Sequence, residues 1–229
     1  MFDEISYDRG ISRGDEIRSR KAEQARVRRN RRTGLNFEDD MYEDSSRYLI
    51  LFSTLNYKKR YREDVTLSTI QGHRDRLFRH MEDYNSELLR GICGVIWKLE
   101  EGKRSGLHLH VLVFYRGDRR ADVPICRMLG EYWEHDITKG WGDYWNSNAH
   151  KADLEHRWGV GLGQVNRHND PKRDSLRLFI ENYMAKSNQV PRDRTEDDKL
   201  FGTRFFDRED RYSLKSCDVQ RKQISADAV

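Results

Sequence analysis

The sequence predicts an α+β protein with a central antiparallel sheet and helices mainly on one of its faces. Segments of strand and helix length follow one another in the order strand, helix, strand, strand, helix, strand, helix along the 229 residues. The second and third strands are joined by a short polar, glycine-containing connection. Because such a hairpin joins antiparallel neighbours, the pattern is typical of the α+β class.

The N-terminal segment, residues 1–46, holds too few apolar side chains to offset the entropy of ordering. We predict a basic, mobile arm in which 22–29 can become helical on binding, followed by an acidic and polar linker at 36–45. The arm can bind phosphates by counterion release, although a merely solubilising tail has the same composition. The arginines expected to contact DNA are Arg28, Arg29, Arg31 and Arg32.

The first strand is predicted at 48–57, where a nearly continuous apolar run is typical of a central strand covered on both faces. Lys58 and Lys59 follow it and are candidate DNA contacts. A helix is expected over 65–89, with Thr66 or Ser68 as its N-terminal cap and an apolar stripe along it.

The hairpin formed by 92–99 and 106–115 carries the chemistry. His108 and His110 are two residues apart on a strand and therefore point to the same face. If the turn is centred on Arg104, Glu100 lies opposite His108 and completes a three-ligand metal group, and a shift of one residue presents Glu101 instead. We prefer Glu100. Imidazole and carboxylate ligands suit Mn²⁺ or Mg²⁺, whereas an isolated His pair is more often two polar residues on a solvated strand face.

Beyond the hairpin, large aromatic rings gather in the second half of the chain. Trp141, Tyr144 and Trp145 lie in a predicted loop at 141–148 and provide stacking surfaces for unpaired bases. Trp133 and Trp158 are expected in the core. The remaining predicted segments are a helix over 122–133, a glycine-interrupted strand at 158–165, a helix over 171–187 capped by Asp174 or Ser175, a charged loop at 193–199 and an edge strand at 201–206.

The histidine pair, the acid on the neighbouring strand and a later tyrosine together resemble the HUH (His-hydrophobic-His) endonucleases. Tyr183 and Lys186 are three residues apart in the last predicted helix, and this Tyr-x-x-Lys arrangement is similar to the third motif of single-tyrosine initiators. More narrowly, residues 48–206 resemble the replication-initiator-like proteins of filamentous phages (inoviruses) and related prophages. The resemblance implies a ferredoxin-like, RRM-like sheet, with the arm at 1–46, an endonuclease domain at 47–206 and a polar tail at 207–229.

The resemblance also implies a reaction. Glu100, His108 and His110 would bind Mn²⁺ or Mg²⁺, and Tyr183 would attack single-stranded DNA at an origin to form a tyrosine-5′-phosphate link. Lys186 would supply a cation, and the released 3′-hydroxyl would prime rolling-circle replication with a host helicase and polymerase. The alternatives are a non-catalytic single-strand-binding protein on the same sheet, or an HUH transposase or relaxase.

Composition sets wider bounds. Charged residues make up 36% of the chain and the net charge is +4, a modest excess that alone identifies no partner. Three widely spaced cysteines form no Cys-x-x-Cys pair and indicate reduced thiols. No signal peptide and no run of membrane-spanning length is evident, so we expect a soluble cytoplasmic protein. The sequence does not indicate the oligomeric state or the origin recognised.

Overall fold

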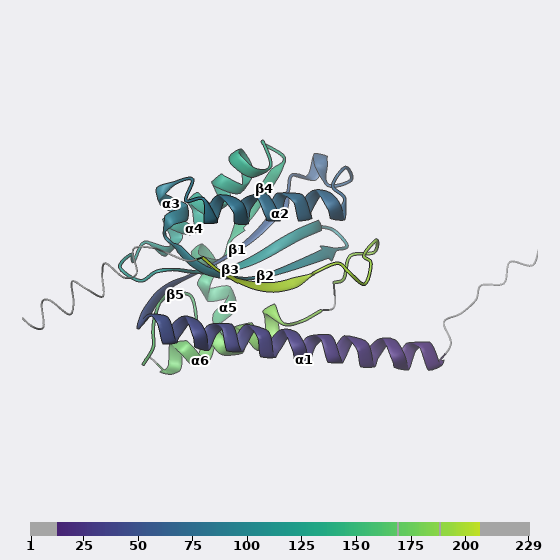
Figure 1. The fold of residues 1–229 in the computed structure, drawn as a ribbon, viewed down its shortest axis with the longest axis horizontal. Helices are drawn as coiled ribbons and strands as arrows, with labels where there is room; N and C mark the ends of the chain where they lie inside the picture. The colour runs from purple at the N-terminus through teal and green to yellow at the C-terminus, as the bar shows by residue number, and fades with distance from the viewer. Residues whose placement is uncertain (1–12, 169, 188, 207–229) are drawn as a thin grey trace, which may run out of the picture.

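An antiparallel sheet runs through the centre of the computed structural model, which describes residues 13–168, 170–187 and 189–206 (Figure 1). The tail predicted at 207–229 lies outside the described residues. The strand order is β4-β1-β3-β2-β6, and β5 pairs with the other end of β1. The strands are β1 (Arg47–Tyr57), β2 (Ile92–Gly102), β3 (Gly106–Arg116), β4 (Gly142–Asn146), β5 (Gly163–Asn166) and β6 (Phe201–Phe205).

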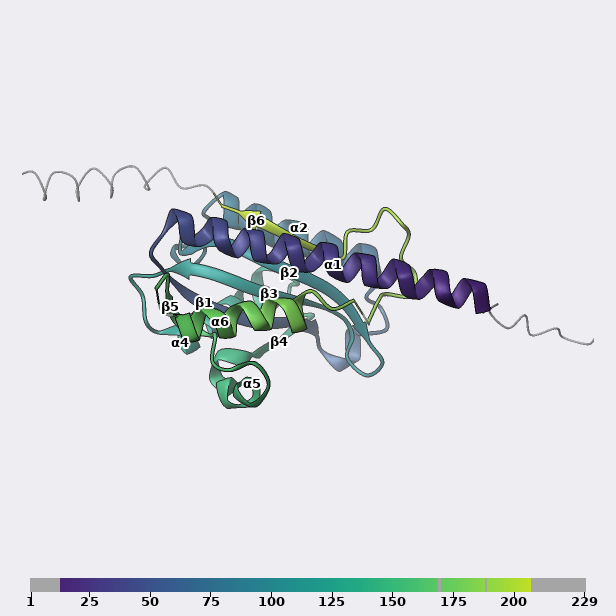
Figure 2. The ribbon, with the colours of Figure 1, turned by 90° about the horizontal axis from the view of Figure 1, so that it is seen from below.

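Helices cover both faces of this sheet. In Figure 1, α2, α3 and α4 lie above it, and α1 and α6 lie below it; Figure 2 shows the lower layer from beneath. Two helices continue into short π-helical turns, α4 into η2 (Trp133–Ile137) and α6 into η4 (Ile180–Met184). The α-helices are α1 (Arg13–Asp44), α2 (Leu67–Glu82), α3 (Glu87–Arg90), α4 (Asp122–Tyr132), α5 (Lys151–Trp158) and α6 (Asp170–Phe179), and 3₁₀ turns form η1 (Lys59–Tyr61) and η3 (Ser147–His150).

Two separate apolar clusters fill the space between the sheet and its two helical layers. In β1, Leu49 and Leu51 face the α2–α4 layer, whereas Ile50 faces the α1–α6 layer, and all three are buried. The predicted α+β class and the covered central strand are confirmed. The expectation of helices mainly on one face is wrong, because α1 and α6 form a second layer.

The second layer depends on α1. Its C-terminal half presents Gly34, Phe37 and Met41 on one face, as their spacing of three and four residues requires. Phe37 and Met41 are buried against the sheet, and a Cβ on Gly34 would come within 2.8 Å of Ile180 Cγ2 in η4. The expected linker at 36–45 is therefore wrong: these residues end a packed helix.

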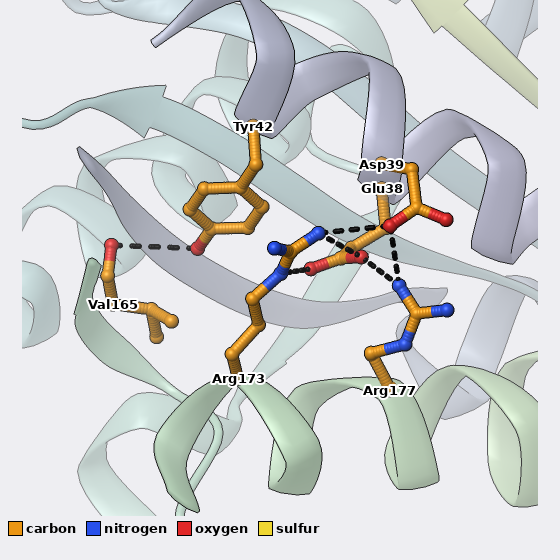
Figure 3. Close-up of polar contacts among 6 residues, drawn as sticks. All are labelled: Glu38, Asp39, Tyr42, Val165, Arg173 and Arg177. Atoms are coloured by element: carbon orange, nitrogen blue, oxygen red, sulfur yellow. Dashed lines mark hydrogen bonds and ion pairs between the residues drawn. The ribbon is translucent and has the colours of Figure 1, made fainter. Parts of the chain in front are cut away.

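Ion pairs fix α1 to α6 (Figure 3). The Glu38 carboxylate is fully buried and accepts hydrogen bonds from Arg173 Nε at 2.7 Å and Arg177 Nη1 at 2.6 Å. Asp39 accepts from the same two arginines at 2.9 and 2.6 Å. The Arg173 guanidinium lies 4.7 Å from the centre of the Tyr42 ring. Since removing one partner of a buried pair costs about 3 to 5 kcal/mol, this network sets the position of α6 on α1.

Other predicted elements differ in their limits. The helix expected over 65–89 is divided into α2 and α3 at Tyr84, whose φ of 50° no helix accommodates. The Thr66 cap is confirmed, since its hydroxyl accepts from Thr69 N at 3.2 Å. Asp174 and Ser175 are not caps, because α6 begins before them.

The aromatic segment at 141–148 is not a loop, because residues 142–146 form β4 and pair with β1. The predicted strand at 158–165 is shorter, since Trp158 ends α5 and β5 begins at Gly163. The edge strand at 201–206 is confirmed as β6, paired with β2. Among the described residues, no helix is long and apolar enough to cross a membrane.

Candidate active site

The hairpin of β2 and β3 places the metal-ligand candidates on one face of the sheet. Gly106 has a φ of +68°, which glycine adopts without strain, and it pairs with Gly102 at the turn. In the resulting register Glu100 lies opposite His108, as predicted. Glu101 lies opposite Leu107, and its carboxylate accepts a hydrogen bond from Arg192 N at 2.8 Å.

The three candidate ligands converge on one point. The Nε2 atoms of His110 and His108 lie 3.1 and 3.9 Å from the same oxygen, Glu100 Oε2. One ligand atom from each side chain lies within 4.8 Å of the others, and all three residues are buried. Ligands about 2 Å from one ion are separated from each other by about 3 to 4 Å, so this group fits a metal ion.

Hydrogen bonds to the second ring nitrogen orient both imidazoles. His108 Nδ1 donates to the carbonyl oxygen of Gly106 at 2.9 Å, which leaves Nε2 free as a ligand atom. His110 Nδ1 lies 3.0 Å from the Thr54 hydroxyl on β1. Burial lowers the pKa of His108 and lowers that of His110 to about 4. Both rings are therefore neutral near pH 7, the form in which histidine binds metals.

Lys98 is a site residue that the sequence reasoning missed. It is buried, and its Nζ lies 3.1 Å from Glu100 Oε1, which leaves Oε2 facing the histidines. Burial would raise the pKa of Glu100, but the hydrogen bond from His110 and the charge of Lys98 outweigh burial and lower it. The signal was the strand period of two, which puts residue 98 on the same face as residue 100.

Tyr183 lies directly beside this group. Its ring is edge-on to that of His110, with centroids 5.4 Å apart, and Lys98 Nζ is 4.4 Å from its centre. Lys98 Nζ also donates to the Tyr183 carbonyl oxygen at 2.9 Å. Burial, aided by the charge of Glu100, raises the pKa of Tyr183 to about 12. The tyrosine sits in the π-helical turn η4, a feature common at functional sites.

Lys186 lies two residues beyond the end of η4, and its side chain is exposed. The helix face that it was expected to share with Tyr183 therefore does not extend to it. Burial lowers the pKa of Lys98, and the nearby charge of Lys186 adds a smaller effect in the same direction. The cation in contact with the Tyr183 ring is that of Lys98.

A family model for the replication-associated protein ORF2 matches residues 50–188. The chain belongs to this family. Its members are inovirus replication initiators of the HUH type, so the predicted family is confirmed. The matched range contains the metal group and Tyr183, and it leaves out α1 and β6. A search of curated proteins finds no match.

In this replication-associated protein, the predicted stacking residues separate. Trp145 pairs with Thr54, and Thr54 pairs with His110, so Trp145 shares the face of the metal group. It is 50% exposed and stacks on His150 with centroids 4.2 Å apart. Trp141 is 37% exposed and stacks on Tyr61. Tyr144 points to the opposite face and packs on the cluster beneath α2 and α4.

The predicted basic contacts also separate. Lys58 pairs with Glu134 at 2.5 Å, so its charge is balanced, whereas Lys59 is exposed. The four arginines are exposed on α1, but only one of them, Arg29, lines a cavity that reaches Lys98 and Glu100. The other three, which lie on the remaining surface of the helix, are Arg28, Arg31 and Arg32.

Proposed function

We propose that this protein is a replication-initiation endonuclease that nicks and rejoins single-stranded DNA at the origin of a phage or prophage element. Membership of the ORF2 family of replication-associated proteins gives the context of replication and DNA. The observation that carries the proposal is the position of Tyr183, whose ring lies 5.4 Å from that of His110 beside three buried metal-ligand candidates. A phenol, two imidazoles and a carboxylate in one place supply a nucleophile and a cation site, which phosphodiester cleavage needs.

In the proposed reaction, a divalent ion such as Mn²⁺ or Mg²⁺ held by Glu100, His108 and His110 would neutralise and orient the phosphate. Tyr183 Oη forms a bond to phosphorus while the bond from phosphorus to the 3′ oxygen breaks. The phenolic proton is lost, and the departing oxygen gains a proton to become a 3′-hydroxyl. The other strand end stays attached as a 5′-phosphotyrosine, and reversal of the same step rejoins DNA.

Lys98 supports this reaction as a positioning residue. It contacts one oxygen of the Glu100 carboxylate and the backbone carbonyl of Tyr183, so it links the metal ligand to the nucleophile. Its charge beside the Tyr183 ring favours negative charge on the phenolic oxygen as the proton leaves. Lys186, at the exposed end of the same segment, is placed to contact a phosphate of the bound strand.

The released 3′-hydroxyl would prime rolling-circle synthesis in the host cytoplasm. Strand separation and synthesis would depend on a host helicase and polymerase, because the sequence holds no P-loop pattern. Bases next to the cleaved phosphate would stack on Trp145, which is exposed on the same face as His110.

The test is a covalent adduct. Purified protein is incubated with labelled single-stranded origin DNA and Mn²⁺ or Mg²⁺, and denaturing electrophoresis separates protein-linked from free DNA. We expect an adduct with the wild type, none with Tyr183→Phe, and DNA binding by both.

Tyr132→Phe is the matched control, because Tyr132 lies on α4 against the opposite face of the sheet, and it should keep the adduct. An adduct that persists in Tyr183→Phe would contradict the proposed nucleophile. Binding without any adduct, across metals and origins, would favour a non-catalytic single-strand-binding protein.

A further inference from the structure

A cavity of about 570 Å³ lies between α1 and the chain at 189–203. Lys98 and Glu100 line it, so it opens onto the metal group. One wall is the basic part of α1 and another is the segment that leads into β6. Both walls lie outside the range 50–188 matched by the family model, so the cavity is built largely from parts of the chain that the family match does not describe.

Positive charge dominates the lining. Two of its acids are already engaged: Glu100 belongs to the metal group, and Asp198 accepts hydrogen bonds from Gln71 at 2.7 Å and Thr195 N at 2.6 Å. The third is Glu196. The cationic side chains around the cavity are Arg26, Arg29, Lys98, Lys186, Arg194 and Lys199.

Arg26 and Arg194 lie close enough to repel one another. Burial lowers the pKa of Arg26, the charge of Arg194 lowers it further, and Glu23 on the same helix opposes these effects in part. Arg26 Nε donates to Ser187 Oγ at 2.8 Å, a neutral acceptor that leaves the guanidinium charge unbalanced. Two guanidinium groups crowded at one cavity would be stabilised by an anion between them, and phosphate geometry suits guanidinium donors well.

The position of the cavity identifies the anion. Trp145 lies on β4 at one edge of the sheet, and β6 lies at the other edge beside the cavity. The metal group on β2 and β3 lies between them. A single strand that crosses the polar face over the metal group therefore passes from the Trp145 side into the cavity.

We propose that this cavity binds the sugar-phosphate backbone of the DNA strand next to the cleaved phosphate, with Arg26, Arg29 and Arg194 as phosphate contacts. The proposal rests on the function proposed above and adds the path of the substrate. It assigns α1 a specific role as one wall of the DNA channel. Arg28, whose side chain is exposed and does not line the cavity, then contributes less than Arg26.

The test measures binding without cleavage. Full-length variants in the Tyr183→Phe background bind a labelled single-stranded oligonucleotide of mixed sequence, without divalent ions, at several salt concentrations. For single strands, log K falls with log salt by about 0.7 for each phosphate neutralised. Arg26→Ala and Arg194→Ala should each reduce this slope by about 0.7, and Arg28→Ala should reduce it less.

Two controls separate charge from structure. Arg127→Ala removes an exposed arginine from α4 on the far face, and its slope should match the parent. Ser187→Ala removes the hydrogen bond to Arg26 but no charge, so its slope should also match. Unchanged slopes in Arg26→Ala and Arg194→Ala, or an equal reduction in Arg28→Ala, would overturn the proposal.

The two proposals fail in different ways. If the wild type forms the covalent adduct but the cavity variants keep the parental slope, only the DNA path is wrong. If the slopes fall as expected and no adduct forms with any metal or origin, the cavity binds DNA backbone and the cleavage reaction is wrong.

Discussion

The two faces of the β2–β3 hairpin are made by alternate residues of the same two strands, and both are buried, yet their chemistry differs completely. One face is wholly apolar here and packs against α2 and α4. The other carries four ionisable groups under the α1–α6 layer. The apolar set is Trp97, Leu99, Leu109 and Val111, and the polar set is Lys98, Glu100, His108 and His110.

The difference shows how one hairpin separates stability from chemistry. Buried apolar side chains stabilise the fold in proportion to the area they remove from water. Buried ionisable groups cost free energy unless their partners satisfy them, and here each group has such a partner. The polar face is thus arranged for binding and catalysis, and the apolar face and α1 hold it in place.

The largest effect that would sharpen this comparison is loss of metal binding. An ion that binds only the folded state at a hundred times its Kd stabilises the protein by about 2.7 kcal/mol. Calorimetric melting with and without Mn²⁺ should show this shift for the wild type and no shift for the His108→Ala, His110→Ala double variant. A metal-dependent shift in the double variant would place the ion elsewhere.

Leu109→Ala is the matched change on the opposite face, between the two histidines. Leu109 is fully buried, and removal of such a side chain typically costs about 2 to 5 kcal/mol of unfolding free energy. Denaturant unfolding should show that loss, while the stabilisation by Mn²⁺ should remain. If Leu109→Ala abolished metal binding at unchanged stability, the two faces would not be separate.

Lys98→Met tests whether the link between Glu100 and Tyr183 matters for function. Methionine retains most of the buried side-chain volume, and groups that orient metal ligands typically affect affinity or activity by about 10- to 100-fold. We expect adduct formation to slow by that factor, with a smaller loss of Mn²⁺ affinity. Rates equal to those of the wild type would show that Lys98 is only structural.

The smallest effect is expected at the edge of the polar face. Stacking of a base on an exposed aromatic ring contributes about 1 to 3 kcal/mol, and Trp145 is already stacked on His150. Trp145→Ala should weaken single-strand binding by about 1 kcal/mol in an anisotropy titration. Tyr144→Ala, on the apolar face, should leave that affinity closer to the wild type, and the reverse order would exclude Trp145 as the stacking surface.

Local patterns predicted the metal group well. A hairpin fixes its register through a few residues of turn, so the pairing of Glu100 with His108 followed from the sequence. The same period of two applies to Lys98, but a lysine on a strand is usually solvated, and only the packing of Tyr183 over it shows otherwise.

Long-range packing was less predictable. The apolar residues of α1, among them Phe37 and Met41, follow a long basic run, so the segment has the composition of a mobile arm. Its order depends on tertiary contacts such as the buried Glu38–Arg173 pair, which no local pattern reveals. For the same reason the second helical layer and the cavity beside it could not be anticipated.

The most direct test of the central claim, that the polar face forms a nicking site, is to find where the DNA becomes attached. The wild-type adduct formed with Mn²⁺ is digested with nuclease and protease, and mass spectrometry identifies the peptide that carries a nucleotide. We predict attachment at Tyr183, beside His110 and Lys98. Attachment at a different tyrosine, such as Tyr144 on the apolar face, would contradict the account.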